Sequence, residues 1–274
     1  MWTWLAIGVV VALVGTLVLV KVVGGSTLPR TTTSQAVTPA AVLAEVTSIP
    51  ASVYDAVGVG SPTVPIAAPV AVSGLRRLDF TSAAGHRLAG VLFVGAEYCS
   101  FCASERWALI AALSRFGKFP SLYDMDSSAL DFAPSTPSFT FNGVSYSSHR
   151  VVLRAYEVRS DVPTTTNYQR LASLPSRFRN LERQLGASAG YPFVDIANAY
   201  VVRLAAFSPL ALAGETREQI AGALVDPGNP VTRAIVASAN YLSAAICSAD
   251  GQQPASVCGS PGVQAAAAAM RPTA

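Results

Sequence analysis

The sequence is poor in charged residues and in histidine. Only 13% of its 274 residues are Asp, Glu, Lys or Arg, the formal net charge is +3, and the two histidines, His86 and His149, stand far apart. So small a charge does not indicate a nucleic-acid partner. There is no Gly-rich phosphate loop, no Ser-His-Asp pattern and no group of acids at metal-ligand spacing. We therefore expect no bound metal and no cofactor.

The longest apolar run lies at the N-terminus. Residues Trp2 to Val20 carry no charge, and about 20 apolar residues cross a bilayer, whereas a cleavable signal has an apolar region of about 7–15. We expect residues 1–24 to be an uncleaved single-pass anchor that enters the membrane through residues 2–23. Lys21 and Arg30 follow the run, and the positive-inside rule would place the rest of the chain in the cytoplasm. Four cysteines in two short-range pairs suit an oxidising compartment better, so we favour the extracytoplasmic side.

Composition divides the remaining chain into three regions. Residues 25–72 are rich in Thr, Ala, Val, Ser and Pro, which predicts a flexible tether with one or two short helices around Pro50. Residues 73–262 are long enough for one domain with its own core. The Ala-rich residues 263–274 are expected to be a frayed, flexible tail.

Two cysteines lie at the centre of the predicted domain. The apolar run that ends at Gly95 predicts a buried strand, and the Ala- and Leu-rich run after Cys102 predicts a helix. Cys99 therefore falls at a helix N-terminus, where unpaired N–H groups and the helix dipole favour the reactive thiolate. A second thiol three residues later can close a disulfide with the first, or attack a mixed disulfide that the first has formed.

Other interpretations of this Cys-Ser-Phe-Cys pair remain open. A Cys-x-x-Cys motif is also half of a zinc site, but Cys247 and Cys258 have ten residues between them and do not supply a second close pair. The cysteines could also be inert in a degenerate fold. We favour a redox pair because it stands on a strand-to-helix turn.

The residues around the pair resemble two known groups. The run Ala96-Glu-Tyr-Cys-x-x-Cys102 resembles the Ala-Glu-Trp-Cys-x-x-Cys of thioredoxins. The longer run from Phe93 to Leu109, with Leu113-Ser-Arg-Phe-Gly117 behind it, is similar to an uncharacterised prokaryotic family called domain of unknown function 929, over about residues 45–262. The resemblance implies a thioredoxin-like α/β fold, with a central sheet flanked by helices.

The resemblance also implies roles for single residues. Cys99 would be the nucleophile and Cys102 the resolving thiol. Pro192 would be a cis-proline beside the pair, and the backbone of Tyr191 would pair with a substrate strand. The sequence alone leaves a trans proline at the start of a strand as the alternative, because cis is the minority state of X-Pro bonds. Tyr191, Pro192, Ser100 and Phe101 would then shape the substrate groove. The acids on either side, Glu97 and Glu105, could tune the thiolate, although we expect both to be solvated.

Two positions depart from the resemblance. Ser100 stands where that family is expected to have proline, and Phe93 stands where thioredoxins have a buried acid that relays a proton. Since no acid on that strand is placed to help Cys102 attack, we expect an oxidase or isomerase rather than a reductase.

Local patterns predict the rest of the domain. Alternating residues on both sides of Asn142-Gly143 predict a hairpin over residues 138–147. An apolar stripe at helical spacing predicts a helical insertion over residues 168–185, with a kink at Pro175. The arginines on its other face are interpreted as solvated, and the alternative is a lid or a docking surface for an acidic partner. Asn229 and Pro230 predict a helix start.

The second cysteine pair follows that last helix. A disulfide between Cys247 and Cys258 closes a short loop, which is worth about 3 kcal/mol in the chain-entropy model. A structural staple is the favoured interpretation. The alternative is a shuttle that exchanges electrons with Cys99 and Cys102.

Together these patterns predict a membrane-anchored, extracytoplasmic thiol–disulfide oxidoreductase. Its partners would be exported cysteine-containing proteins and a membrane redox protein that recycles the pair. The alternative is a non-catalytic thioredoxin-fold subunit that binds or assembles within a membrane complex.

Overall fold

The computed structural model describes residues 35–60, 63–82, 85–185 and 190–271. The predicted membrane anchor, residues 1–24, lies outside these residues. Among the described residues no single helix is long and apolar enough to cross a membrane; the pair Ala40–Thr47 and Ala51–Val57 passes that test together, with a bend of 54°.

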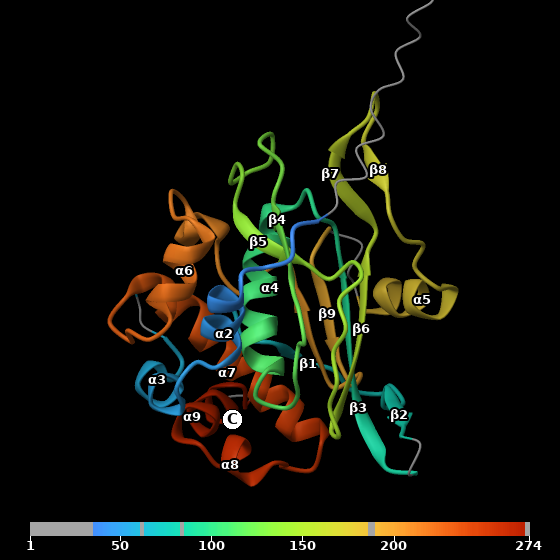
Figure 1. Cartoon of the computed structure of the whole chain (residues 1–274). Helices are drawn as coiled ribbons and strands as arrows, with labels where there is room; N and C mark the ends of the chain where they lie inside the picture. The colour runs from blue at the N-terminus through green and yellow to red at the C-terminus, as the bar shows by residue number, and fades with distance from the viewer. Residues whose placement is uncertain (1–34, 61–62, 83–84, 186–189, 272–274) are drawn as a thin grey trace, which may run out of the picture. The chain divides into compact units, whose positions relative to one another are not determined.

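A six-stranded mixed sheet forms the centre of the fold (Figure 1). Its strands are β1 (Val70–Ala71), β2 (Asp79–Thr81), β3 (Arg87–Gly95), β6 (Val151–Glu157), β9 (Phe193–Ile196) and β10 (Tyr200–Arg203). The central strand β3 pairs in parallel with β6 and antiparallel with β9 and β2, and β10 joins β9 to β1. Two smaller antiparallel pairs stand apart: β4 (Tyr123–Asp126) with β5 (Pro137–Thr140), and β7 (Arg159–Pro163) with β8 (Tyr168–Arg170).

Helices cover both faces of this sheet. They are α2 (Ala40–Thr47), α3 (Ala51–Val57), α4 (Ser100–Leu113), α5 (Ser176–Gln184), α6 (Arg217–Ala223), α7 (Pro230–Ala249), α8 (Ala255–Cys258) and α9 (Pro261–Ala269), with a 3-10 turn η2 at Pro209–Leu212. In Figure 1, α2, α4 and α7 lie on one side of the strands and α5 on the other. The described chain is therefore a mixed α/β protein with a central sheet flanked by helices.

The alternation of side chains along β3 builds two cores. Val91 and Phe93 belong to the large core shared with α4 and α7, whereas Leu92 and Val94 pack with Phe178 on the α5 side. Successive side chains of a strand point to opposite faces, so one apolar strand can serve both cores. Helix α4 lies inside the larger core and is buried at every position except Phe101.

The domain begins earlier than the predicted residue 73. Described residues from Ala36 onward belong to the same compact unit. Helices α2 and α3 are present around Pro50 as expected, but they are not part of a loose tether, because Val46 and Tyr54 are buried in the main core. The Tyr54 hydroxyl donates a hydrogen bond of 2.9 Å to the carbonyl of Ala111.

The prediction that residues 263–274 form a frayed tail is also wrong for most of that segment. Residues up to Ala269 form α9, where Val263 and Ala266 are buried against the rest of the domain. An Ala-rich helix can pack closely onto a neighbouring helix, and α9 does so with α7.

The predicted hairpin over residues 138–147 does not form. Strand β5 pairs instead with β4, placing Phe139 opposite Asp124, and Ser147 makes only an isolated bridge with Lys118. Packing decides the partner, because the Phe139 ring meets the Trp107 ring of α4 edge-on, with centroids 4.6 Å apart.

The predicted helical insertion is only partly helical. Tyr168 lies on strand β8, and α5 begins after Pro175 and is nine residues long. Pro175 is the N-cap residue of α5 with an extended ψ of 146°, so it precedes the helix rather than kinking it.

Candidate functional site

The two central cysteines lie where the sheet meets α4. Strand β3 ends at Gly95, and Cys99 is the N-cap of α4, so its Sγ accepts the Cys102 N–H at 3.2 Å. The predicted helix-terminal position is thus present. Both cysteines are free thiols; Cys102 is fully buried and Cys99 is 7% exposed. Sγ of Cys102 also accepts the Ala96 N–H at 3.5 Å.

The surroundings of the pair shift the pKa values of its two thiols in opposite directions. A hydrogen bond from the Cys102 thiol lowers the pKa of Cys99, burial opposes this, and the Cys102 backbone N–H and the Arg106 guanidinium lower it further. Burial raises the pKa of Cys102 well above its usual range, and the bond to Cys99 adds to this. The Cys99 thiol therefore loses its proton before the Cys102 thiol does, and the thiolate of the pair forms on Cys99.

Tyr191 and Pro192, two of the predicted groove residues, lie next to the cysteine pair, just before the neighbouring strand β9. The peptide bond between Tyr191 and Pro192 is cis and directly precedes β9. The Cys99 thiol donates to the carbonyl oxygen of Tyr191, with 3.6 Å between sulfur and oxygen. Tyr191 and Pro192 therefore stand beside the more exposed of the two thiols.

A loop over residues 127–136 covers the start of α4. Its Asp131 carboxylate accepts the backbone N–H of Ser100 at 2.6 Å. Its Phe132 ring stacks on Phe101, with centroids 5.3 Å apart, and the Phe132 side chain remains largely exposed. Ser100 and Phe101 thus lie beside the pair and are held by a loop that sequence reasoning missed. The N–H that Asp131 accepts exists because position 100 is not proline.

A buried ion pair behind the cysteines was also missed. Arg106 donates two hydrogen bonds to the Glu157 carboxylate, each 2.8 Å, and a third to the Ala96 carbonyl at 2.9 Å. Both side chains are almost completely buried. Burial disfavours the charged guanidinium, but Glu157 outweighs this and raises the pKa of Arg106.

The position of Arg106, though not that of Glu157, could have been predicted from the sequence. Arg106 follows Cys102 by four residues on the predicted helix, so both lie on one helix face. Glu157 is the last residue of β6 and pairs with Gly95 across the sheet, a contact that only the fold reveals.

The prediction that Glu97 and Glu105 are solvated is wrong. Glu97 is buried and accepts the Thr140 hydroxyl at 2.6 Å, and burial raises its pKa. Glu105 is fully buried because α4 is surrounded on all sides; burial raises its pKa to about 8, while the Ala206 N–H that it accepts at 2.9 Å opposes the shift. Both acids are largely removed from solvent, which favours the neutral, protonated form of each.

The second cysteine pair forms a disulfide. Cys247 near the end of α7 is bonded to Cys258 in α8, with their Cα atoms 5.6 Å apart. Arg115, just beyond α4, donates to Ser260 at 3.0 Å, so this disulfide lies near the end of α4 opposite to Cys99. A helix of this length spans about 20 Å, which favours the staple over a shuttle that must touch Cys99.

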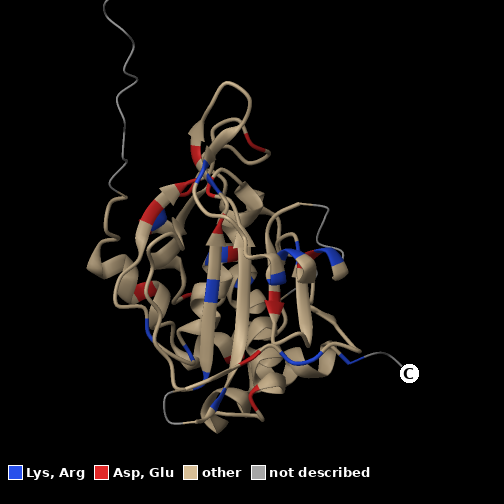
Figure 2. Ribbon diagram, turned by 90° about the vertical axis from the view of Figure 1, so that its right-hand side faces the viewer, with Lys and Arg blue, Asp and Glu red and all other residues tan. Residues whose placement is uncertain are grey.

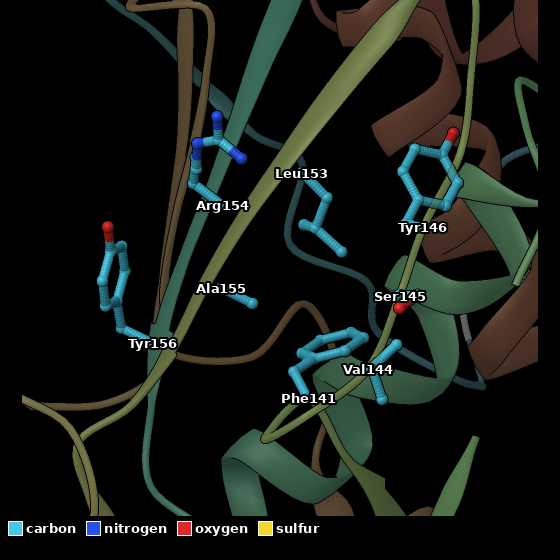
Figure 3. Close-up of a pocket in the computed structure, with 8 residues that line it drawn as sticks. All are labelled: Phe141, Val144, Ser145, Tyr146, Leu153, Arg154, Ala155 and Tyr156. Carbon is cyan, nitrogen blue, oxygen red and sulfur yellow. The ribbon is translucent and has the colours of Figure 1, made fainter. Parts of the chain in front are cut away.

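A cavity away from the cysteines lies beside β6 (Figure 3). It has a volume of about 370 Å³, and Leu153 and Ala155 of β6 point across it toward Phe141 and Val144. Neither cysteine nor Tyr191 lines it. Within the described part of the chain, no three His, Cys, Asp or Glu side chains are grouped so that they could hold a metal ion.

Fold and site together define a mixed α/β protein that carries a Cys-x-x-Cys dithiol at the N-terminus of a buried helix. The chain belongs to the family described as Domain of unknown function (DUF929), whose model matches residues 78–248. The family resemblance inferred from the residues around Cys99 is thereby confirmed. No curated protein and no solved structure matches the chain.

Proposed function

We propose that this protein is a thiol–disulfide oxidoreductase of thioredoxin-like fold. The observation that carries the proposal is the asymmetry of its dithiol, in which the pKa of the N-cap Cys99 is lowered and that of the buried Cys102 is raised. A thiolate is the nucleophile in disulfide exchange, so Cys99 is suited to meet the substrate and Cys102 to resolve the product.

The arrangement around the pair supports the same proposal. The dithiol follows the central strand β3, and the cis-proline Pro192 precedes the antiparallel neighbour β9. The thioredoxin resemblance implies a proline of this kind at this place in the chain. The carbonyl of Tyr191, within reach of the Cys99 thiol, is suited to bond with an extended substrate segment.

In the proposed reaction the oxidised pair accepts two electrons from a substrate dithiol. A substrate thiolate attacks Sγ of Cys99, which forms a mixed disulfide and releases Cys102 as a thiolate that takes up a proton. The second substrate thiol loses its proton and attacks the substrate sulfur of the mixed disulfide. The substrate leaves as a disulfide, Cys99 leaves as a thiolate, and the pair is reduced. Isomerisation uses the reverse attack, by the Cys99 thiolate on a wrong substrate disulfide.

We further propose that the enzyme acts outside the cytoplasm and is held at the membrane by residues 2–23. Its substrates would be exported proteins with cysteines. Because each oxidation leaves the pair reduced, a membrane redox partner must reoxidise it. The rival function is a non-catalytic binding or assembly subunit, for which no exchange at Cys99 is required.

Replacing the resolving thiol tests the proposal. In Cys102→Ser the resolving attack is removed, so Cys99 should accumulate mixed disulfides with client proteins that a reductant releases. The matched control is Cys99→Ser, which should trap none. Trapping through Cys102 in that control would reverse the assignment, and no trapping in either variant would favour the non-catalytic subunit.

A further inference from the structure

A cavity with a basic wall lies beside the dithiol. It has a volume of about 390 Å³ and lies between the β7–β8 hairpin, α5 and Tyr191. Three arginines line it, Arg159, Arg170 and Arg179, and among its lining residues Glu182 is the single acid. Figure 2, which views the molecule from the side where α5 lies in Figure 1, shows blue Lys and Arg segments on that short helix.

The three guanidinium groups keep unused binding capacity. Arg159 donates to the Tyr168 carbonyl at 2.8 Å and Arg179 to the Leu174 carbonyl at 2.9 Å, while the side chain of Arg170 has no hydrogen-bond partner among the described residues. Within the same residues none of the three forms an ion pair. Each guanidinium has five N–H donors, so most of these donors remain available to a ligand.

Glu182 does not neutralise the cavity. It is half-buried, and burial raises its pKa while Arg179 opposes the shift. One carboxylate faces three guanidinium groups, which leaves the cavity with an excess of positive charge. An anion is therefore the ligand that its chemistry favours.

Tyr191 connects the cavity to the reacting sulfur. Its side chain lines the cavity, and its carbonyl oxygen accepts the Cys99 thiol. A molecule bonded to Cys99 that runs across Tyr191 therefore has its neighbouring groups at the basic wall. Arginine pairs with carboxylate through two parallel N–H donors, which fixes orientation as well as affinity.

We propose that this cavity binds a carboxylate carried by the molecule that exchanges disulfides with Cys99. The carboxylate belongs either to an acidic residue near the cysteine of a polypeptide or to a small acidic thiol. This inference rests on the proposed function and adds a specificity to it: substrates with an acid close to their cysteine react fastest.

The test compares acidic and neutral disulfides on the reduced full-length protein. Two peptides differ only in Glu or Gln two residues from their single cysteine, which is bonded to neutral 2-thiopyridine; release of thiopyridone measures attack by Cys99. A second arm uses the thiopyridyl disulfides of N-acetylglutathione and of its uncharged diester. The variants are Arg170→Gln and Arg179→Gln, and the matched control is Arg183→Gln, an exposed arginine of α5 that does not line the cavity.

We expect the acidic probe of at least one arm to react roughly tenfold faster than its neutral partner. A hydrogen bond to a charged group contributes enough free energy to change a rate about tenfold or more. The ratio should fall toward one in Arg170→Gln and Arg179→Gln and persist in Arg183→Gln. The arm that shows the effect identifies the source of the carboxylate. Equal rates in both arms, or a preference that survives both cavity variants, would overturn the inference while leaving the proposed function intact. No reaction with any probe would overturn the proposed function and this inference with it.

Discussion

The carboxylate of Asp131 accepts the backbone N–H of Ser100 at 2.6 Å, at the same helix N-terminus that stabilises the Cys99 thiolate. Two negative groups therefore share one helix end. The charge of Asp131 raises the pKa of Cys99 and so opposes the stabilisation that the helix provides. This loop acid sets a limit on how reactive Cys99 becomes.

Removal of this charge should make Cys99 more reactive. Asp131→Asn keeps an oxygen that can accept the Ser100 N–H, so we expect alkylation of Cys99 by iodoacetamide at pH 6 to be roughly two- to threefold faster, as expected for one partly screened charge. Glu215→Gln removes an exposed acid elsewhere and should change nothing. A slower reaction in Asp131→Asn would contradict the account.

The buried pair of Arg106 and Glu157 should contribute to both stability and reactivity. Arg106→Met leaves the Glu157 carboxylate buried without its partner, which should cost about 3–5 kcal/mol of unfolding free energy in denaturant titrations. Because Arg106 lowers the pKa of Cys99, alkylation of Cys99 should also be slower at a given pH.

The double variant Arg106→Met/Glu157→Leu separates these effects. It should recover part of the lost stability, since no unpaired charge remains, but not the reactivity of Cys99. Full recovery of Cys99 reactivity would show that the guanidinium does not act on the thiolate.

The buried acid Glu105 predicts a pH dependence of stability. Burial raises its pKa to about 8 in the folded state, so the folded protein binds a proton that the unfolded chain releases above about pH 4.5. The stability that protonated Glu105 contributes is therefore fully present below about pH 4.5 and is lost as the pH rises to about 8. Between these two values the free energy of unfolding falls by about 1.4 kcal/mol per pH unit. Urea titrations should show this fall in the wild type and a flatter profile in Glu105→Gln, which is neutral throughout. Identical profiles would place the Glu105 carboxyl in a solvated environment.

The disulfide between Cys247 and Cys258 should act as a staple alone. Replacing both cysteines by serine should cost about 3 kcal/mol of unfolding free energy, the value for a loop of this size. Alkylation of Cys99 should be unchanged, because the disulfide lies near the far end of α4. Non-reducing peptide mapping of the wild type that found both residues as free thiols would contradict the staple.

Local chemistry made the centre of the site predictable. A strand, a cysteine N-cap and an apolar helix follow one another directly, so their relation can be read within about 20 residues of sequence. The helix that begins at Asn229 and Pro230 was predictable for the same reason, since the Asn229 side chain accepts the Val231 N–H at 2.8 Å.

Long-range partners were not predictable from one sequence. Asn142-Gly143 forms a turn with Gly143 at positive φ, but β5 pairs with β4 and not with the residues after the turn, because tertiary packing decides the partner. The partners Arg106 and Glu157 lie 51 residues apart, and Asp131 lies 31 residues from Ser100. Each of these contacts depends on the sheet order or on the course of a loop, neither of which leaves a local pattern.

The redox potential of the Cys99–Cys102 pair tests the central claim most directly. The protein would be equilibrated with glutathione buffers, and the oxidised fraction of the pair read from mass spectra after alkylation. The stabilised Cys99 thiolate makes the disulfide easier to reduce, so we expect a moderately oxidising potential between about −120 and about −230 mV, suited to an oxidase or isomerase. A potential at or below about −270 mV, the value of thioredoxin, would contradict this account, as would a pair that forms no disulfide at all.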